Sequence, residues 1–427
     1  MSRIAVIGAG QVGLTTAACF AALGHDVICA DADASKIRQL GKGEVPFLET
    51  GLPELVEDGL RGKRLRFVTS GRDAADGAEF AFLCVPTPRG EDGGADLSII
   101  DAVVREIAPV LDARSIVVNK STAPVGTVRR IADVVRESGG PDVGVASNPE
   151  FLRGGTAVKD FLEPARIVIG ADDPAVADRV QRLYDGVAAP VVVTGAASAE
   201  LIKYASNSFL ATKLSFVNAI ANVCDEVGAD IKDVTLGMGY DPRIGFEYMD
   251  AGPGWGGSCL PKDVAALVKT AEEAGYDLDM LRTVIAVNDA QRERIVAKIR
   301  AVCGGSLDGA TVAVWGLTWK AGTDNVHDSA SIDIAQRLIA EGAAVRAYDP
   351  VAGEAGAELG LQIATDAYEC CTGADALAVL TEWEVFRVLD FDRVKSELAA
   401  PAIVDARNVL DADALRARGF TYAGVGR

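Results

Sequence analysis

The sequence predicts an α/β protein in which two domains with open parallel sheets flank an all-α segment. Short apolar strands alternate with helical patterns over residues 1–195. Residues 196–300 have helical periodicity without strands, and the alternation returns over residues 301–427. Alternating strands and helices form parallel sheets with helices on both faces. We therefore expect three domains with these boundaries.

The chain begins with a strand–helix–strand unit. Residues 3–7 form an apolar strand, residues 14–23 have a helical pattern, and residues 27–30 form the next strand. Between the first strand and the helix lies the pattern G-x-G-x-x-G, which starts at Gly8 and ends at Gly13. After a strand and at the start of a helix, this pattern is typical of a dinucleotide-binding Rossmann domain.

Each residue of this fingerprint has a physical role. Gly8 permits the tight turn, Gly10 lets the backbone approach a pyrophosphate, and Gly13 lets the helix pack closely on the strand. The positive N-terminus of the helix faces the phosphates. Asp31, at the end of the second strand, can accept a hydrogen bond from a ribose 2′-hydroxyl and repels a 2′-phosphate, which favours NAD over NADP. Lys36 nearby weakens that preference.

Further strands are predicted at residues 80–85, 115–118 and 143–146. Two proline-containing loops, residues 85–88 and 120–124, each follow a strand. The carboxyl ends of parallel strands line the ligand crevice of such sheets. Each loop is therefore either a ligand contact or a stiff connection.

The central segment begins with a long helix over residues 199–227, followed by helices over residues 263–275 and 280–300. A helix of this length either links two lobes and carries a subunit interface, or is a buried spacer. The sequence leaves both readings open.

The last domain is a second Rossmann-like α/β unit. We predict strands at residues 311–316, 344–348, 376–380 and 401–405, and a helix at residues 331–340. The domain has no complete G-x-G-x-x-G, so it can hold a nucleotide without being a dinucleotide site. The two α/β domains can be distant copies of one plan.

Composition excludes several classes of function. The net charge of −19 argues against nucleic acid and anionic membranes as partners. Eight cysteines without a paired framework suit a reducing cytoplasm, and two histidines with no C-x-x-C motif argue against a metal site. We see no signal-peptide pattern and no apolar run long enough for a membrane helix.

Residues 254–263 read Gly-Trp-Gly-Gly-Ser-Cys-Leu-Pro-Lys-Asp. This segment places Cys259 in a glycine-rich loop before a predicted helix, where the positive helix end favours a thiolate. A thiolate attacks an aldehyde carbon readily. The alternative is a structural cysteine in a tight loop. Together with a hydride-accepting cofactor, a reactive Cys259 indicates oxidation beyond the aldehyde to an acid.

The order of several motifs is more specific than any one of them. After the glycine fingerprint come residues 85–88, 120–124, 147–152, 200–207 and 254–263. Over essentially the whole chain, this order resembles the UDP-glucose/GDP-mannose dehydrogenase family. The resemblance implies NAD-dependent four-electron oxidation of the C6 alcohol of a nucleotide hexose, through a cysteine thiohemiacetal and thioester. UDP-glucose is the first expectation, with TDP-glucose or GDP-mannose as alternatives, and the active unit is a homodimer or higher homo-oligomer.

The resemblance also assigns catalytic residues. Cys259 matches the nucleophile, and Asp263 matches a carboxylate that helps to activate water. Lys203 and Asn207, four residues apart on the long helix, match a pair that stabilises an oxyanion on C6. Taken alone, these two would be solvated residues of a helix surface. Glu150 matches the acid/base of thioester hydrolysis, and its alternative role is a helix cap.

Further matches give the binding residues. Thr122 matches a threonine that contacts substrate and nicotinamide, and Arg243 an arginine donated across a subunit interface; their alternatives are a turn residue and a surface arginine. The expected cofactor-binding residues are Gly8, Gly10, Gln11, Val12, Gly13, Asp31, Lys36, Thr87, Thr122, Lys262 and His327. The expected substrate-binding residues are Glu150, Phe151, Leu152, Lys203, Asn207, Arg243, Gly252, Gly254, Trp255, Gly256, Lys320 and Arg407.

Two positions depart from the family pattern. Gly154 stands where the family usually has a glutamate near the nicotinamide, and His327 where it usually has an arginine that contacts NAD. The change at Gly154 is expected to alter NAD affinity, loop order or thioester hydrolysis, and His327 is expected to give a weaker contact to NAD. The alternatives are a two-electron hydroxyacid dehydrogenase of the 6-phosphogluconate type, which needs no nucleophilic cysteine, and a catalytically silent nucleotide-binding regulator.

Overall fold

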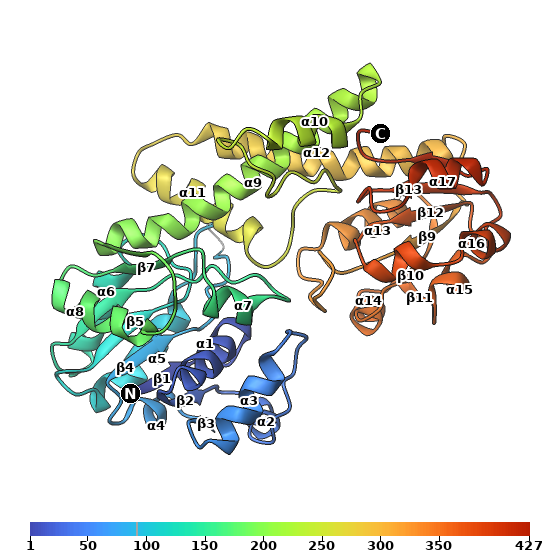
Figure 1. The fold of residues 1–427 in the computed structure, drawn as a ribbon. Coiled ribbons are helices and arrows are strands. Elements are labelled where there is room, and N and C mark those ends of the chain that lie inside the picture. Colours follow the sequence, from blue (N-terminus) through green and yellow to red (C-terminus); the bar gives the residue numbers. More distant parts are fainter. Residues whose placement is uncertain (91–92) are drawn as a thin grey trace. The chain divides into compact units, whose positions relative to one another are not determined.

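The computed structural model describes residues 1–90 and 93–427 (Figure 1). The chain divides into two compact units. The first unit comprises Met1–Ser206 and Ala265–Tyr276, and the second comprises Asn207–Val264 and Asp277–Arg427. Each unit contains one β-sheet. The predicted arrangement of two α/β sheets with a helical segment between them in the sequence is confirmed.

The sheet of the first unit has the strand order β3-β2-β1-β4-β5-β6-β7-β8. Neighbouring strands from β3 to β6 pair in parallel, but β6 and β7 pair antiparallel through Ser147 and Gly170. The prediction of a wholly parallel sheet is therefore wrong at this one junction, since β7 and β8 run parallel to each other but against the rest. The strands are β1 (Arg3–Ile7), β2 (Asp26–Ala30), β3 (Leu65–Val68), β4 (Phe80–Leu83), β5 (Ile116–Asn119), β6 (Gly144–Ser147), β7 (Ile167–Gly170) and β8 (Val191–Thr194).

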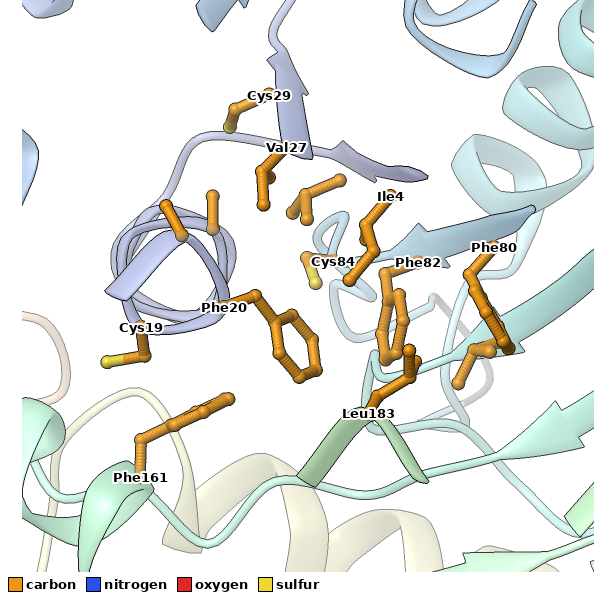
Figure 2. Close-up of a cluster of buried hydrophobic side chains, with 14 of the residues drawn as sticks. Ile4, Cys19, Phe20, Val27, Cys29, Phe80, Phe82, Cys84, Phe161 and Leu183 are labelled. Carbon is orange, nitrogen blue, oxygen red and sulfur yellow. The ribbon is translucent and has the colours of Figure 1, made fainter. Parts of the chain in front are cut away.

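A buried aromatic cluster fixes the first helix on this sheet (Figure 2). The ring of Phe20 on α1 lies 5.1 Å from that of Phe82 on β4 and 5.2 Å from that of Phe161 on α7. This packing holds the last turns of α1 against β4 and α7. The helices of the unit are α1 (Gln11–Ala22), α2 (Ala34–Leu40), α3 (Leu52–Arg61), α4 (Gly71–Ala75), α5 (Ser98–Ile107), α6 (Thr127–Glu137), α7 (Ala157–Leu162) and α8 (Pro174–Gln181), with 3-10 turns at Ala108–Val110 and Arg182–Tyr184.

Four helices follow the first sheet in sequence. The long predicted helix is present as α9 (Ala196–Val227), and the other two predicted helices are α11 (Leu260–Glu273) and α12 (Asp279–Val302). The helix α10 (Ile231–Gly239) was not predicted; its first turn is capped by the carboxylate of Asp230. The helices α9 and α11 each contribute residues to both units.

The sheet of the second unit is parallel throughout, with the order β11-β10-β9-β12-β13-β14. If β9 is counted as the first strand of this sheet, its strand order is the same as that of β1 to β6 in the first sheet. The two sheets therefore share one topology over six strands. The elements are β9 (Thr311–Trp315), α13 (Ala330–Ala340), β10 (Ala344–Tyr348), α14 (Gly353–Glu358), β11 (Gln362–Ile363), α15 (Ala367–Cys371), β12 (Ala376–Val379), a 3-10 helix (Glu384–Val388), α16 (Phe391–Glu397), β13 (Ala402–Asp405), α17 (Ala412–Ala417) and β14 (Thr421–Ala423).

Candidate active site

The glycine fingerprint has the geometry that its spacing predicts. Gly8 has φ +102°, and a Cβ there would lie 2.4 Å from the carbonyl oxygen of Cys84. A Cβ on Gly13 would lie 1.8 Å from the carbonyl oxygen of Gly8, so only glycine lets α1 pack this closely on the β1 turn. Gly10 precedes α1, and a Cβ there would have no described atom within 4 Å. The space beside Gly10, at the positive end of α1, can admit a phosphate group.

Asp31 lies directly after β2 and faces this turn. One carboxylate oxygen accepts hydrogen bonds from the Ala9 amide at 2.9 Å and from Lys36 Nζ at 3.0 Å. Burial by itself raises the pKa of Asp31, but the hydrogen bonds from the Asp33 and Ala9 amides and from Lys36 lower it below its usual value. Asp31 is therefore ionised, as the predicted role at a ribose hydroxyl requires. Lys36 neutralises part of this charge.

The two proline-containing loops lie together at the ends of β4 and β5. The hydroxyl of Thr87 donates to the carbonyl oxygen of Thr122 at 2.7 Å, and the hydroxyl of Ser121 donates to that of Val85 at 2.8 Å. Thr122 is half-buried. Thr87 and Thr122 were predicted separately, and the structure places them in direct contact.

The first unit also contains a buried ion pair. Lys203 Nζ on α9 lies 2.9 Å from Glu150 Oε1, and the two side chains are only 5 % and 6 % exposed. The other oxygen of Glu150 accepts from the Leu152 amide at 2.6 Å, and the Phe151 ring lies 5.5 Å from Lys203 Nζ. Burial alone raises the pKa of Glu150, but Lys203, the Leu152 amide and the charge of Lys120 lower it below its usual value. The alternative of a solvated Lys203 is wrong.

The second unit holds Cys259 and a second buried carboxylate. Cys259 directly precedes α11 and is exposed, with its sulfur 3.8 Å from the hydroxyl of Ser258. Its carbonyl oxygen accepts from the Asp263 amide at 3.0 Å, which makes the first helical turn. The carboxylate of Asp263 is fully buried and accepts from Asn207 Nδ2 and Lys262 Nζ, each at 2.6 Å. Asn207 is therefore a buried partner of Asp263 and not an exposed helix residue.

Polar side chains from α9 and α12 hold the glycine-rich loop before Cys259. Asn288 accepts from the Trp255 amide at 2.8 Å and donates to the Trp255 carbonyl oxygen at 3.0 Å. Asn218 accepts from the Gly252 amide at 2.8 Å, and Gln291 donates to the carbonyl oxygen of Gly252 at 2.9 Å. These three side chains are buried, and none of them was predicted from the sequence.

The conformation of this loop depends on its glycines. Gly254 has φ +108°, and a Cβ on Gly256 would lie 2.1 Å from the carbonyl oxygen of Asp328. The indole of Trp255 donates to the hydroxyl of Ser215 at 2.9 Å. The predicted loop residues Gly252, Gly254, Trp255 and Gly256 are thus fixed in one backbone conformation.

Four other predicted contact residues lie in the second unit. Arg243 is exposed and pairs with Asp241 at 2.6 Å, and Lys320 lies with its Nζ 4.9 Å from the ring of Trp319. Arg407 is largely buried and donates to the carbonyl oxygens of Leu380 and Trp319, at 2.9 and 2.7 Å. The exposed His327 lies 3.6 Å from a carboxylate oxygen of Asp328.

A buried glutamate in the first unit was also missed. Glu49 is 2 % exposed and accepts hydrogen bonds from Gln11 Nε2 at 2.8 Å, from the Gly155 amide at 2.9 Å and from the Ala157 amide at 2.8 Å. It links the fingerprint residue Gln11 to the loop that contains Gly154. The residue type and spacing of Glu49 give no signal for this bridge, because two of its partners are backbone amides.

The described residues, with 91 and 92 left out, contain no group of three or more His, Cys, Asp or Glu side chains that could hold a metal ion. Within the same residues, every helix is too short or too polar to cross a membrane.

Comparisons with known proteins cover the whole chain. Models of the UDP-glucose/GDP-mannose dehydrogenase family match residues 2–188 (NAD binding domain), 197–290 (central domain) and 313–412 (UDP binding domain). The chain is 45 % identical to the UDP-glucose 6-dehydrogenase of Rhizobium meliloti, over 100 % of this chain and 99 % of that protein. It is 42 % identical to the enzyme of the same name from Pseudomonas aeruginosa, over 100 % and 97 % of the two chains. A solved UDP-glucose dehydrogenase from Pyrobaculum islandicum superposes with a TM-score of 0.93 at 36 % identity, over 100 % and 98 % of the chains.

Proposed function

This chain belongs to the UDP-glucose/GDP-mannose dehydrogenase family, and from that membership we propose that it oxidises the C6 alcohol of UDP-glucose to the carboxylate of UDP-glucuronate. The reaction removes four electrons and consumes two NAD and one water. The observation that carries the proposal is the pairing of two buried carboxylates with Lys203 and Asn207, one helical turn apart on α9, in a chain that also exposes Cys259 at the start of α11. TDP-glucose and GDP-mannose are the alternative substrates.

The cofactor fits the residues of the first unit. The open space beside Gly10 admits a diphosphate at the N-terminus of α1, and the ionised Asp31 suits a free ribose hydroxyl. Further proposed contacts in this unit are Gln11, Val12, Lys36 and Thr87. Two more proposed contacts, Lys262 and His327, belong to the second unit. When bound, NAD supplies the hydride acceptor for both oxidation steps.

The nucleophile is Cys259. Its thiolate adds to the C6 aldehyde and forms a C–S bond, which gives a thiohemiacetal whose oxidation yields a thioester. The C6 oxygen carries negative charge in these steps. The Lys203 ammonium and the Asn207 amide stabilise that charge, and losing one such donor costs roughly 10²–10³-fold in rate.

Glu150 is the base of the last step. Its carboxyl is held ionised, so it can take a proton from the water that attacks the thioester. The C–S bond then breaks, the product leaves as a carboxylate, and the Cys259 thiolate is regenerated. Asp263 orients Asn207 and helps to position the water, and Thr122 contacts the substrate and the nicotinamide.

The substrate residues proposed beyond this centre are Phe151, Leu152, Arg243, Gly252, Gly254, Trp255, Gly256, Lys320 and Arg407. The backbone amides of the glycine-rich loop can bind a diphosphate in spite of the net charge of −19. The division into domains at residues 1–195, 196–300 and 301–427 stays a prediction.

We also propose a homodimer in which Arg243 reaches the partner's substrate. Phe209, Phe216, Val223 and Val227 lie along one face of α9 and are between 51 % and 69 % exposed. An apolar stripe of this kind supports a subunit interface. We place the protein in the cytoplasm, which suits eight cysteines without a disulfide in the described chain.

Counting NADH per sugar tests the proposed function. Purified protein is incubated with limiting UDP-glucose, TDP-glucose or GDP-mannose and an excess of NAD or NADP, and the NADH or NADPH yield is measured by absorbance. Two NADH per UDP-glucose, with UDP-glucuronate identified by mass spectrometry, is the expected result. One NADH per sugar indicates a two-electron dehydrogenase, and none indicates a silent binding protein; either result refutes the proposal.

A further inference from the structure

Lys120 is a buried cation for which the proposed chemistry has no role. It lies directly after β5, is 4 % exposed, and its Nζ donates to the side-chain oxygen of Asn148 at 3.1 Å. The Phe161 ring lies 5.8 Å from this nitrogen. In the described part of the chain, no carboxylate forms an ion pair with Lys120. A buried ammonium without a counterion costs several kcal/mol, so its presence at this position calls for an explanation.

The partner of Lys120 lies two residues before Glu150. Asn148 also accepts from the hydroxyl of Tyr184 at 2.5 Å and donates to the carbonyl oxygen of Val168 at 2.8 Å. Three bonds therefore fix its side chain at the end of β6. The backbone that leads to Glu150 starts from this fixed point.

Lys120 also acts on Glu150 through its charge. Its ammonium is one of the causes that lower the pKa of Glu150, after burial, Lys203 and the Leu152 amide. Burial lowers the pKa of Lys120 itself to about 8, while the Glu150 carboxylate opposes that shift, so Lys120 is mostly charged at neutral pH. The other groups near the pair are Arg166, whose charge also acts on Glu150, and Cys19 and Cys84, which burial keeps neutral by raising their pKa to about 12.

We propose that Lys120 is a positioning residue for thioester hydrolysis: it is a second buried cation that, with Lys203, holds Glu150 as a carboxylate, and its bond to Asn148 fixes the strand end that presents Glu150. This inference rests on the proposed function, in which Glu150 is the base. Lys120 needs no contact with the substrate for this role. Its charge, and not only its hydrogen bond, is the property that matters.

Two variants separate the charge from the hydrogen bond. Lys120→Met removes the ammonium and the bond to Asn148, whereas Tyr184→Phe removes another bond to the same Asn148 oxygen and leaves the charge in place. The pH dependence of acid formation is measured for both variants and the wild type. Since loss of a nearby cation makes a carboxylate harder to ionise, we expect the acid limb of Lys120→Met to move to higher pH by roughly one unit. The acid limb of the pH profile of Tyr184→Phe should stay within about 0.3 unit of wild type, because this substitution removes a neutral hydroxyl and leaves the charge near Glu150 unchanged.

A readout that needs no turnover makes the test independent of the proposed function. The carboxyl ¹³C signal of Glu150, identified by its loss in Glu150→Gln, is titrated in protein labelled at glutamate. A higher midpoint in Lys120→Met than in wild type and Tyr184→Phe supports the proposal. An unchanged midpoint in Lys120→Met, or an equal shift in Tyr184→Phe, overturns it. If Lys120→Met does not fold, Lys120→Gln serves as the neutral variant. If the wild type yields two NADH per sugar and the Glu150 midpoint is the same in Lys120→Met as in wild type, the role of Lys120 is refuted and the proposed function is not.

Discussion

Replacement of Asn288 by leucine tests whether one side chain holds the loop before Cys259. Asn288 is 2 % exposed and makes two hydrogen bonds to the backbone of Trp255, at 2.8 and 3.0 Å. The Trp255 carbonyl oxygen keeps a bond from Arg292 Nη2 at 3.1 Å, but the Trp255 amide loses its bond to the Asn288 side-chain oxygen. The lost bond to the carbonyl oxygen costs about 0.5–1.5 kcal/mol and the buried amide left unsatisfied about 1–3 kcal/mol, so the free energy of unfolding should fall by about 1.5–4.5 kcal/mol.

The assay can follow the second unit alone. All four tryptophans of the sequence, at positions 255, 315, 319 and 383, belong to that unit, so urea unfolding followed by tryptophan fluorescence reports its stability. Turnover should fall as well, because the loop leads directly to Cys259. The matched control is Thr283→Val on the same helix, which removes one bond of 3.0 Å to the Asp279 carbonyl oxygen at an exposed position and should change stability by no more than about 0.5 kcal/mol. An Asn288→Leu protein with wild-type stability and turnover would refute the argument.

The other predictions concern the reaction centre and the cofactor. Cys259→Ser should abolish net acid formation while NAD binding, measured by calorimetry, is unchanged; full turnover by this variant would contradict the covalent route. Lys203→Met leaves Glu150 buried and unpaired, which should cost about 3–5 kcal/mol of stability, and addition of Glu150→Gln should restore stability but not activity. Gly154→Glu should tighten NAD binding, and an unchanged dissociation constant would count against it. Glu49→Gln places an amide group against a backbone N–H, so it should lower stability by about 1–3 kcal/mol. It should also weaken NAD binding, and an NAD affinity equal to that of wild type would show that the bridge to Gln11 is irrelevant.

Most of the fold could be predicted because its signals are local. The apolar strands before each loop, and the glycines that only a tight strand–helix turn tolerates, are visible in a few consecutive residues. The direction of β7 was missed for a physical reason. Its short apolar stretch favours a strand, but only the path of the chain from β6 through α7 decides whether that strand pairs parallel or antiparallel with β6, and residue type does not encode this path.

The difference between the residues that were found and those that were missed has one cause. Cys259, Lys203 and Glu150 carry functional groups that chemistry requires, so residue type and motif order point to them. Glu49 instead accepts from the backbone amide of Gly155, which is 106 residues away. Asn288 accepts from the backbone amide of Trp255, which is 33 residues away. Every residue except proline has such an amide, so these partners leave no trace in the residue types. A buried polar side chain that supports an active-site loop becomes recognisable only when the fold brings that loop to it.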